Sequence, residues 1–357
     1  MKKFVPVVQF LVAIVFIFSG FVKMIDPVGT KIKLLEYFSE DVLNLAFLSP
    51  YALWIGVLLI LLEFSLGIWL LVGYRPKFTV RALFLLILFF LFLTGYSAIY
   101  NKVTDCGCFG DAVKLSNWET FYKNIVLFFL ILYLNFKVDY IQTFFNKKIR
   151  IALAHGFSFV AFVLMIYTIR HLPLIDFRPY AIGKNIKAGM TIPPNAPQAR
   201  FKDIWYYKIN GKVQKFSSDE QPWNIKGAEF VKRITITLQE GYTPPIHDFS
   251  IENEKAGDIT EQVLKEPEIY LIISSNPAKI TPGAQKIINR TADLLIKKGH
   301  KVIGLFALKD QNISQRFHFP IYLTDATTLK TMIRSNPGLI KLEYGTVVEK
   351  KAWRDLP

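Results

Sequence analysis

Residues 51–74 read YALWIGVLLILLEFSLGIWLLVGY, a run in which Glu63 is the only charged residue. A helix needs about 20 apolar residues to cross the hydrocarbon layer of a bilayer, so this stretch predicts a membrane-spanning helix. The composition of the whole chain agrees. Of its 357 residues, 52% are hydrophobic and only 20% are charged, which is below the proportion of about a quarter typical of soluble domains.

Further apolar blocks lie on both sides of this run. Residues 4–22 and 82–100 contain no charged residue, and residues 151–169 contain one His as their only titratable group. A weaker block at residues 124–136 reaches spanning length only if the aromatic lead-in from Trp118 is included. Together the blocks predict five membrane-spanning helices.

The spans predict a four-helix membrane domain in residues 1–140 and a fifth transmembrane helix within residues 141–172. The first block follows Lys2 and Lys3, as a secretory signal would, but it ends without a small-x-small cleavage site. We therefore interpret it as a retained span.

Positive charges in the loops predict the orientation, because Lys and Arg gather on the cytoplasmic side of a membrane protein. One side carries Lys2, Lys3, Arg75, Lys77, Arg81, Lys137, Lys147, Lys148 and Arg150, and the other carries Lys23, Lys31, Lys33, Lys102 and Lys114. The first side has more Lys and Arg and includes the N-terminus, so the N-terminus is predicted to be cytoplasmic. The loop after the third span and the chain beyond the fifth are then extracytoplasmic, in the periplasm, with the spans in a bacterial inner membrane.

The formal net charge is +15, but the surplus is spread over the chain without a long run of like charge. Such a distribution is not typical of a nucleic-acid-binding arm, so we predict no nucleic-acid partner. We interpret the surplus as attraction to anionic lipid or to another envelope polymer. The predicted partners are the lipid bilayer and extracytoplasmic client or complex proteins.

The only two cysteines of the chain, Cys106 and Cys108, lie in the predicted extracytoplasmic loop within DCGCFGD at residues 105–111. An oxidising compartment favours disulfides, and Gly107 gives the backbone the freedom to close a very small Cys-x-Cys ring. A bridge closed under strain is more oxidising than a structural one. The pair therefore suits a redox centre.

Two other interpretations of the cysteines remain open, a passive disulfide and a free thiol pair, while a metal site would need further ligands. The loop offers only Asp105 and Asp111 as further ligands and contains no His, so no metal site is predicted. The same carboxylates would raise a thiol pKa, which argues against a strongly activated thiolate.

Residues 1–140 resemble the MauE branch of the DoxX-like membrane proteins. The resemblance is carried by CGCFG at residues 106–110, GFVKMIDP at 20–27 and EFSLG at 63–67. It implies a role in disulfide formation in partner proteins outside the cytoplasm, and it nominates Cys106 and Cys108 as the redox pair. Nothing in the sequence identifies methylamine or any other substrate.

Glu63 is predicted to lie near the middle of the bilayer, where an ionisable group is costly and marks a candidate functional site. One interpretation is a carboxylate that hydrogen-bonds inside the bundle, and another is a proton acceptor beside a thiol or quinone site. Lys23 is a candidate partner for Glu63, although its amine could equally extend to the lipid headgroups. A quinone is the one candidate cofactor, and no quinone motif can be recognised.

After residue 172 the long apolar runs end and shorter predicted elements with more polar residues begin. Residues 173–240 predict a small β-rich linker domain, with a hairpin turning at Asn210 and Gly211 and an alternating strand at residues 231–238. A second region follows at residues 241–357. Its predicted elements are a strand at 269–273, a helix at 284–298, a strand at 301–306, a strand at 321–325, a short helix and a hairpin at 339–353 that turns at Tyr344 and Gly345. This order predicts an α/β domain with a parallel strand pair.

The α/β pattern resembles a thioredoxin-like domain, with PPIHDF at residues 244–249 and with Pro337 at the place of the family's cis-proline. Where the resemblance would place a Cys-x-x-Cys motif, after the first strand, the chain has SSNPA at residues 274–278. We interpret the domain as a thioredoxin-like adaptor without redox cysteines that recruits partners.

Two functions follow from these observations. The first is a cell-envelope thiol-disulfide redox or disulfide-maturation factor that uses Cys106 and Cys108. The alternative is a non-enzymatic membrane scaffold that anchors an envelope complex, with the cysteines only shaping a loop. Enzymatic activity is left open between the two.

Overall fold

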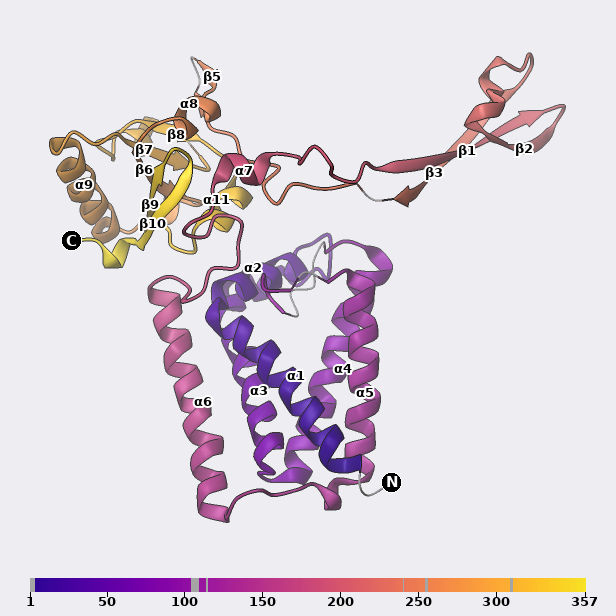
Figure 1. Cartoon of the computed structure of the whole chain (residues 1–357), viewed down its shortest axis with the longest axis vertical. Helices are drawn as coiled ribbons and strands as arrows, with labels where there is room; N and C mark the ends of the chain where they lie inside the picture. Colours follow the sequence, from indigo (N-terminus) through magenta and orange to yellow (C-terminus); the bar gives the residue numbers. More distant parts are fainter. Residues whose placement is uncertain (1–3, 104–108, 114, 240, 254–255, 309–310) are drawn as a thin grey trace.

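The computed structural model describes residues 4–103, 109–113, 115–239, 241–253, 256–308 and 311–357 (Figure 1). Within these ranges, five helices are long and apolar enough to cross a membrane, as predicted. They are α1 (Val5–Ile25), α3 (Ala52–Val72), α4 (Pro76–Tyr100), α5 (Asn117–Phe136) and α6 (Lys147–Arg170). Large apolar side chains such as Leu85, Phe129 and Phe159 are exposed on these helices, where they would face lipid.

The weakest predicted span, α5, does include the aromatic lead-in. Ser116 caps its first turn by accepting a hydrogen bond from Glu119 N, and the Glu119 carboxylate accepts one from Ser116 N in return. This capping box satisfies two backbone donors at the helix start. The Glu119 carboxylate, a charge in the lead-in to this apolar block, therefore belongs to the helix cap.

Helix α1 packs along α3 at short range because glycines lie in the contact. A Cβ atom placed on Gly20 would lie 2.8 Å from Phe64 Cα, and one on Gly67 would lie 2.9 Å from Ile17 N. Small residues that allow backbones to approach are typical of membrane helix pairs. Helix α4 packs against α5, and α6 packs against α3 on the outside of the bundle (Figure 1).

A helix that the sequence analysis missed, α2 (Pro27–Phe38), lies at one end of the bundle, between α1 and α3. Asp26 caps it by accepting a hydrogen bond from Gly29 N at 2.9 Å. The 3₁₀ helix η2 (Ala46–Tyr51) then leads into α3. We call this end of the bundle the domain end, because the α/β domain lies over it (Figure 1).

The α/β domain is built on a seven-stranded sheet in the order β10-β9-β6-β7-β8-β4-β5. The two buried strands at its centre, β6 (Ile269–Ser274) and β7 (Val302–Phe306), run parallel and are joined by α9 (Pro282–Lys297). Strand β8 (Ile321–Leu323) is parallel to β7, and the hairpin of β9 (Gly338–Glu343) and β10 (Thr346–Ala352) completes the other edge. The predicted strand, helix, strand succession and the terminal hairpin are confirmed.

Short elements complete the domain. They are β4 (Glu252–Asn253), β5 (Gly257–Asp258), α7 (Ile186–Met190), α8 (Thr260–Leu264), α10 (Gln311–Ser314), α11 (Ala326–Met332), η6 (Pro277–Lys279) and η7 (Trp353–Asp355). The 3₁₀ helix η3 (Val138–Tyr140) follows α5 in the membrane part. The Asn336–Pro337 peptide bond is cis.

Residues 176–190 also pack on this domain, although they precede the range of 241–357 predicted for it. Ile186 is fully buried in the core of the domain, and its backbone N–H donates to Gly345 O. The core of the α/β domain therefore includes Ile186 and Tyr180, which precede the rest of the domain by many residues in the sequence. Their burial stabilises the domain because it removes apolar surface from water.

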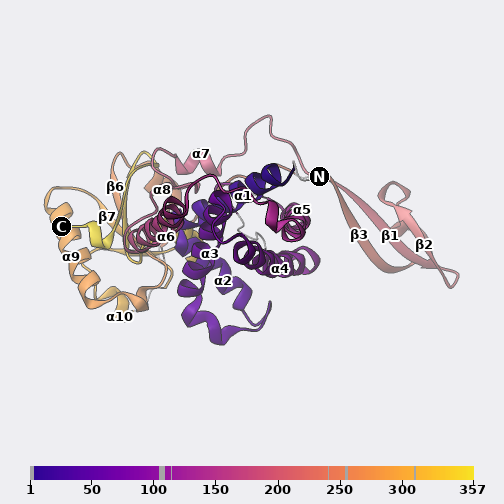
Figure 2. The same ribbon diagram turned by 90° about the horizontal axis from the view of Figure 1, so that it is seen from below.

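The intervening residues form an arm that projects away from the domain and the bundle (Figures 1 and 2). Its three-stranded sheet has the order β2-β1-β3, with β1 (Arg200–Ile209), β2 (Lys212–Ser217) and β3 (Glu229–Gln239). The predicted turn at Asn210 and Gly211 is confirmed, and both residues have positive φ. The 3₁₀ helices η4 (Ser218–Glu220) and η5 (Pro222–Asn224) connect β2 to β3.

Candidate functional site

Lys23 and Glu63 form a buried ion pair inside the bundle. Lys23 Nζ lies 2.7 Å from Glu63 Oε2, and the two side chains are only 10% and 5% exposed. The ammonium also donates to Ser19 Oγ and lies 5.0 Å from the centre of the Phe90 ring. A buried charge without a partner is strongly destabilising, so Lys23 turns inward to Glu63 and does not extend to the lipid headgroups.

Cys106 and Cys108 lie outside the described residues, but the chain on either side of them is placed at the domain end. The Val103 carbonyl accepts a hydrogen bond from Asn117 Nδ2 at 2.8 Å. The Phe109 ring lies 5.4 Å from the Phe18 ring, and Lys123 Nζ lies 4.2 Å above it. The two ends of the cysteine loop are thus attached to helices of the bundle.

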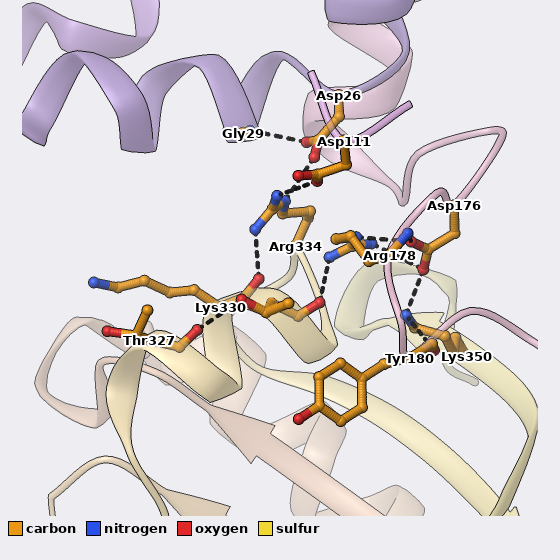
Figure 3. A network of polar contacts seen from close by, with 11 residues as sticks. Asp26, Gly29, Asp111, Asp176, Arg178, Tyr180, Thr327, Lys330, Arg334 and Lys350 are labelled. Carbon is orange, nitrogen blue, oxygen red and sulfur yellow. Dashed lines mark hydrogen bonds and ion pairs between the residues drawn. The ribbon is translucent and has the colours of Figure 1, made fainter. Parts of the chain in front are cut away.

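Arg334 of the α/β domain joins this loop to the bundle (Figure 3). Its Nε donates to Asp26 Oδ2 at 2.7 Å, and its Nη2 donates to Asp111 Oδ2 at 3.2 Å. A third bond runs from Nη1 to Lys330 O at 2.6 Å. The guanidinium-bearing side chain is 8% exposed. Arg334 was not predicted, because no local pattern distinguishes it from other basic residues of the domain.

A second charged cluster fastens residues 176–190 to the domain (Figure 3). Asp176 accepts from Arg178 Nε at 2.7 Å and from Lys350 Nζ at 2.6 Å, while Arg178 Nη1 donates to Thr331 O. Burial lowers the pKa of Lys350 to about 8, and the Arg178 charge acts in the same direction. Burial by itself raises the pKa of Asp176, but Arg178 and Lys350 hold that pKa below its ordinary value.

The loop after β6, where the resemblance would place a Cys-x-x-Cys motif, is closed by hydrogen bonds to Asn336. Ser274 Oγ donates to Asn336 Oδ1 at 2.8 Å, and Asn276 N donates to the same oxygen at 3.1 Å. Asn336 Nδ2 donates in return to Asn276 O at 2.9 Å. Since both cysteines of the chain precede residue 109, thiol chemistry on this loop is excluded.

A cavity of about 980 Å³ lies between the domain and the bundle. Lys23, Glu63, Phe90 and Thr94 line it from the bundle, and Asn276, Lys279, Lys330 and Arg334 line it from the domain. Gly110 and Asp111 of the cysteine loop line it as well. The ion pair, the described end of the cysteine loop and the loop after β6 therefore meet at one cavity, where a bound group could exchange a proton with the pair.

The fold and the cavity define a multi-pass membrane protein with an α/β domain at one end of its helical bundle. Residues 1–136 match the family model described as Methylamine utilisation protein MauE, which confirms the predicted resemblance. This part of the chain, which contains the first four spans, is therefore similar to the MauE proteins. The match ends before α6 and the α/β domain.

The chain is also similar to Protein TlpB of Flavobacterium psychrophilum. The two are 28% identical over 132 residues, which are 36% of this chain and 35% of the relative. The chain thus spans about a third of the length of this relative. No solved structure matches the chain.

Proposed function

We propose that this protein is a thiol-disulfide oxidoreductase of the bacterial inner membrane that forms disulfides in extracytoplasmic client proteins. One observation carries the proposal: the described end of the cysteine loop and the buried Lys23–Glu63 pair line the same cavity. A disulfide-forming membrane enzyme needs a thiol pair next to a place where electrons and protons leave. The positive charges of the loops support an extracytoplasmic location of the domain end.

In the proposed reaction a client thiolate attacks one sulfur of a Cys106–Cys108 disulfide, and a mixed disulfide forms. A second client thiol then attacks the mixed disulfide, so that the client is oxidised and the pair is left as two thiols. Re-forming the disulfide releases two electrons and two protons from the pair. A bound quinone would accept both electrons and both protons and leave as a quinol.

The residues of the cavity fit a quinone ring. Phe90 and Leu93 provide apolar walls, and the Lys23–Glu63 pair provides a donor and an acceptor. We propose that Lys23 donates a hydrogen bond to a ring oxygen and that Glu63 carries protons towards it. The buried position of the pair supports this role, because ionisable groups inside a membrane commonly mark proton or substrate pathways.

We further propose that the α/β domain is a thioredoxin-like adaptor that holds clients over the cysteine loop. The central parallel pair β6 and β7 and the adjoining β9–β10 hairpin support this assignment. The Ser274–Asn336 hydrogen bond supports a binding role without thiol exchange.

Thiol trapping in intact cells tests the proposal. Free thiols are alkylated with a large maleimide before lysis, and the shift of the full chain reports the fraction of reduced Cys106 and Cys108. We expect this fraction to rise when client thiols are in excess and to fall when quinone is restored. The double variant Cys106→Ser, Cys108→Ser should lose client oxidation.

The scaffold alternative gives the opposite outcome. The pair would stay in one redox state under every condition, and the double serine variant would keep full function. Arg334→Gln would then be the damaging change, because it loosens the contact between the domain and the bundle.

A further inference from the structure

Three lysines of the cavity have no partner for their charge among the described residues. Lys31 of α2 lines the bundle side, and Lys279 of η6 and Lys330 of α11 line the domain side. None of the three has an ion pair or hydrogen bond through its ammonium group within the part of the chain that the structure describes. In Figure 3 the Lys330 amine extends away from the charged network. Burial lowers the pKa of Lys31, and the charges of Lys279 and Lys330 lower it further.

The carboxylates that line the same cavity are already paired. Asp26 and Asp111 bind Arg334, Glu36 binds Lys33, and Glu63 binds Lys23. Among the residues that the structure describes, the three lysines therefore leave the outer part of the cavity with an uncompensated positive charge. Because like charges that face one another are unfavourable, this arrangement suits a bound anion.

The inner part of the cavity is apolar and reaches deep into the bundle. Leu34, Leu59, Phe89, Phe90 and Leu93 line it. Phe90 lies about 15 Å along the helix axis from Tyr100, where α4 ends. Half of the hydrocarbon thickness of a bilayer is also about 15 Å. For a bilayer whose surface lies at the end of α4, the cavity would span about the depth of one leaflet, and its three lysines would lie on the headgroup side.

We propose that Lys31, Lys279 and Lys330 hold the phosphate headgroup of an anionic phospholipid, whose acyl chains enter the apolar wall formed by α2, α3 and α4. The lipid would connect the membrane domain to the α/β domain, because Lys31 belongs to one and the other two lysines belong to the second. The headgroup site does not use the Lys23–Glu63 pair or a cysteine, but the acyl chains would share the walls of Phe90 and Leu93 with the proposed quinone, so the two ligands would compete. An acidic peptide would satisfy the lysines but would leave the apolar wall uncovered, so a lipid fits the whole cavity better.

Lipid binding to the full-length protein tests the proposal. The protein is placed in nanodiscs of phosphatidylcholine with and without phosphatidylglycerol, and the lipids that it retains are counted by native mass spectrometry. We expect the wild type to retain phosphatidylglycerol selectively. In the triple variant Lys31→Gln, Lys279→Gln, Lys330→Gln, the affinity should fall about fivefold for each lysine removed, which corresponds to about 1 kcal/mol per charge near a membrane surface.

A matched control removes the same charge elsewhere. Lys286→Gln, Lys297→Gln, Lys298→Gln changes three lysines of the α9 region that do not line the cavity, and it should retain phosphatidylglycerol as the wild type does. Replacing the three cavity lysines with arginine preserves the charge and should keep the selectivity, which separates loss of the site from loss of folding.

Several outcomes would overturn the proposal. Equal loss of lipid in the cavity variant and the control would mean that general charge attracts the lipid. Equal retention of phosphatidylcholine and phosphatidylglycerol would mean that the lysines do not select a headgroup. Displacement of the lipid by inorganic phosphate or by a poly-glutamate peptide at similar concentrations would assign the lysines to a free anion or an acidic protein segment.

Discussion

Arg334 Nε lies 2.7 Å from Asp26 Oδ2, although 308 residues separate the two in the sequence. Asp26 is the residue between α1 and α2, and Arg334 lies two residues after the end of α11 in the α/β domain. The same guanidinium contacts Asp111 of the cysteine loop. One side chain therefore sets the position of the domain over the loop that carries the two cysteines.

Arg334→Gln should loosen the contact between the domain and the bundle by about 2 kcal/mol, because it removes charge-assisted hydrogen bonds and leaves two carboxylates without their partner. Hydrogen exchange of the full chain measures this effect: residues 27–38 and 326–336 should exchange faster. Arg290→Gln, on the exposed face of α9, should leave these segments unchanged. Unchanged exchange in Arg334→Gln would show that other contacts hold the domain.

Breaking the Lys23–Glu63 pair from one side should be more damaging than removing both charges. We expect Glu63→Gln to lower the free energy of unfolding by about 3–5 kcal/mol, because it leaves the Lys23 charge buried alone. The double variant Lys23→Met, Glu63→Leu should recover most of that loss, and it should abolish the proposed reduction of a quinone. Thermal unfolding in detergent gives the stabilities. If the effects of Lys23→Met and Glu63→Leu, each measured alone, add up to the effect of the double variant, the two residues are not coupled.

Gly20→Ala and Gly67→Ala should each destabilise the bundle by about 1–3 kcal/mol, since the new methyl group would meet the backbone of the neighbouring helix. Gly156→Ala on α6 is the control, because a Cβ atom there meets nothing within 4 Å. Alanine is also the better helix former, so this variant should be neutral or slightly stabilising. Equal thermal stability of all three variants would contradict the close packing of α1 on α3.

The α/β domain should become more stable as the pH rises from about 8 to about 10. Folding lowers the pKa of Lys350 to about 8 from an ordinary value of 10.5, so in this range the unfolded chain keeps a proton that the folded domain has released. Denaturant unfolding followed by Trp353 fluorescence measures the trend. The rise should be absent in Lys350→Met and present in the control Lys298→Met, and an equal rise in both would assign it to another group.

Local patterns in the sequence predicted most of the elements correctly. The apolar runs gave all five spans, and Asn210-Gly211 and Tyr344-Gly345 marked the two hairpin turns. Helix α2 was missed even though Asp26 and Pro27 form a helix start signal, because its lysines interrupt the apolar pattern. The packing of residues 176–190 on the α/β sheet had no local signal.

Of the site residues, Lys23 and Glu63 stood out in the sequence because a charge inside an apolar run is conspicuous. Cys106 and Cys108 stood out because they are the only cysteines. Arg334, Asn336 and the three cavity lysines did not stand out, since basic and amide residues are common throughout the later part of the chain.

The sequence by itself determined the membrane helices, the cysteine loop and the absence of a thiol from the α/β domain, because hydrophobicity and residue type are local properties. Only the tertiary structure brought Asp26 to Arg334 and placed Lys31 opposite Lys279 and Lys330. Those contacts depend on how the domain sits on the bundle. That arrangement is set by the packing and charge pairing of residues hundreds of positions apart.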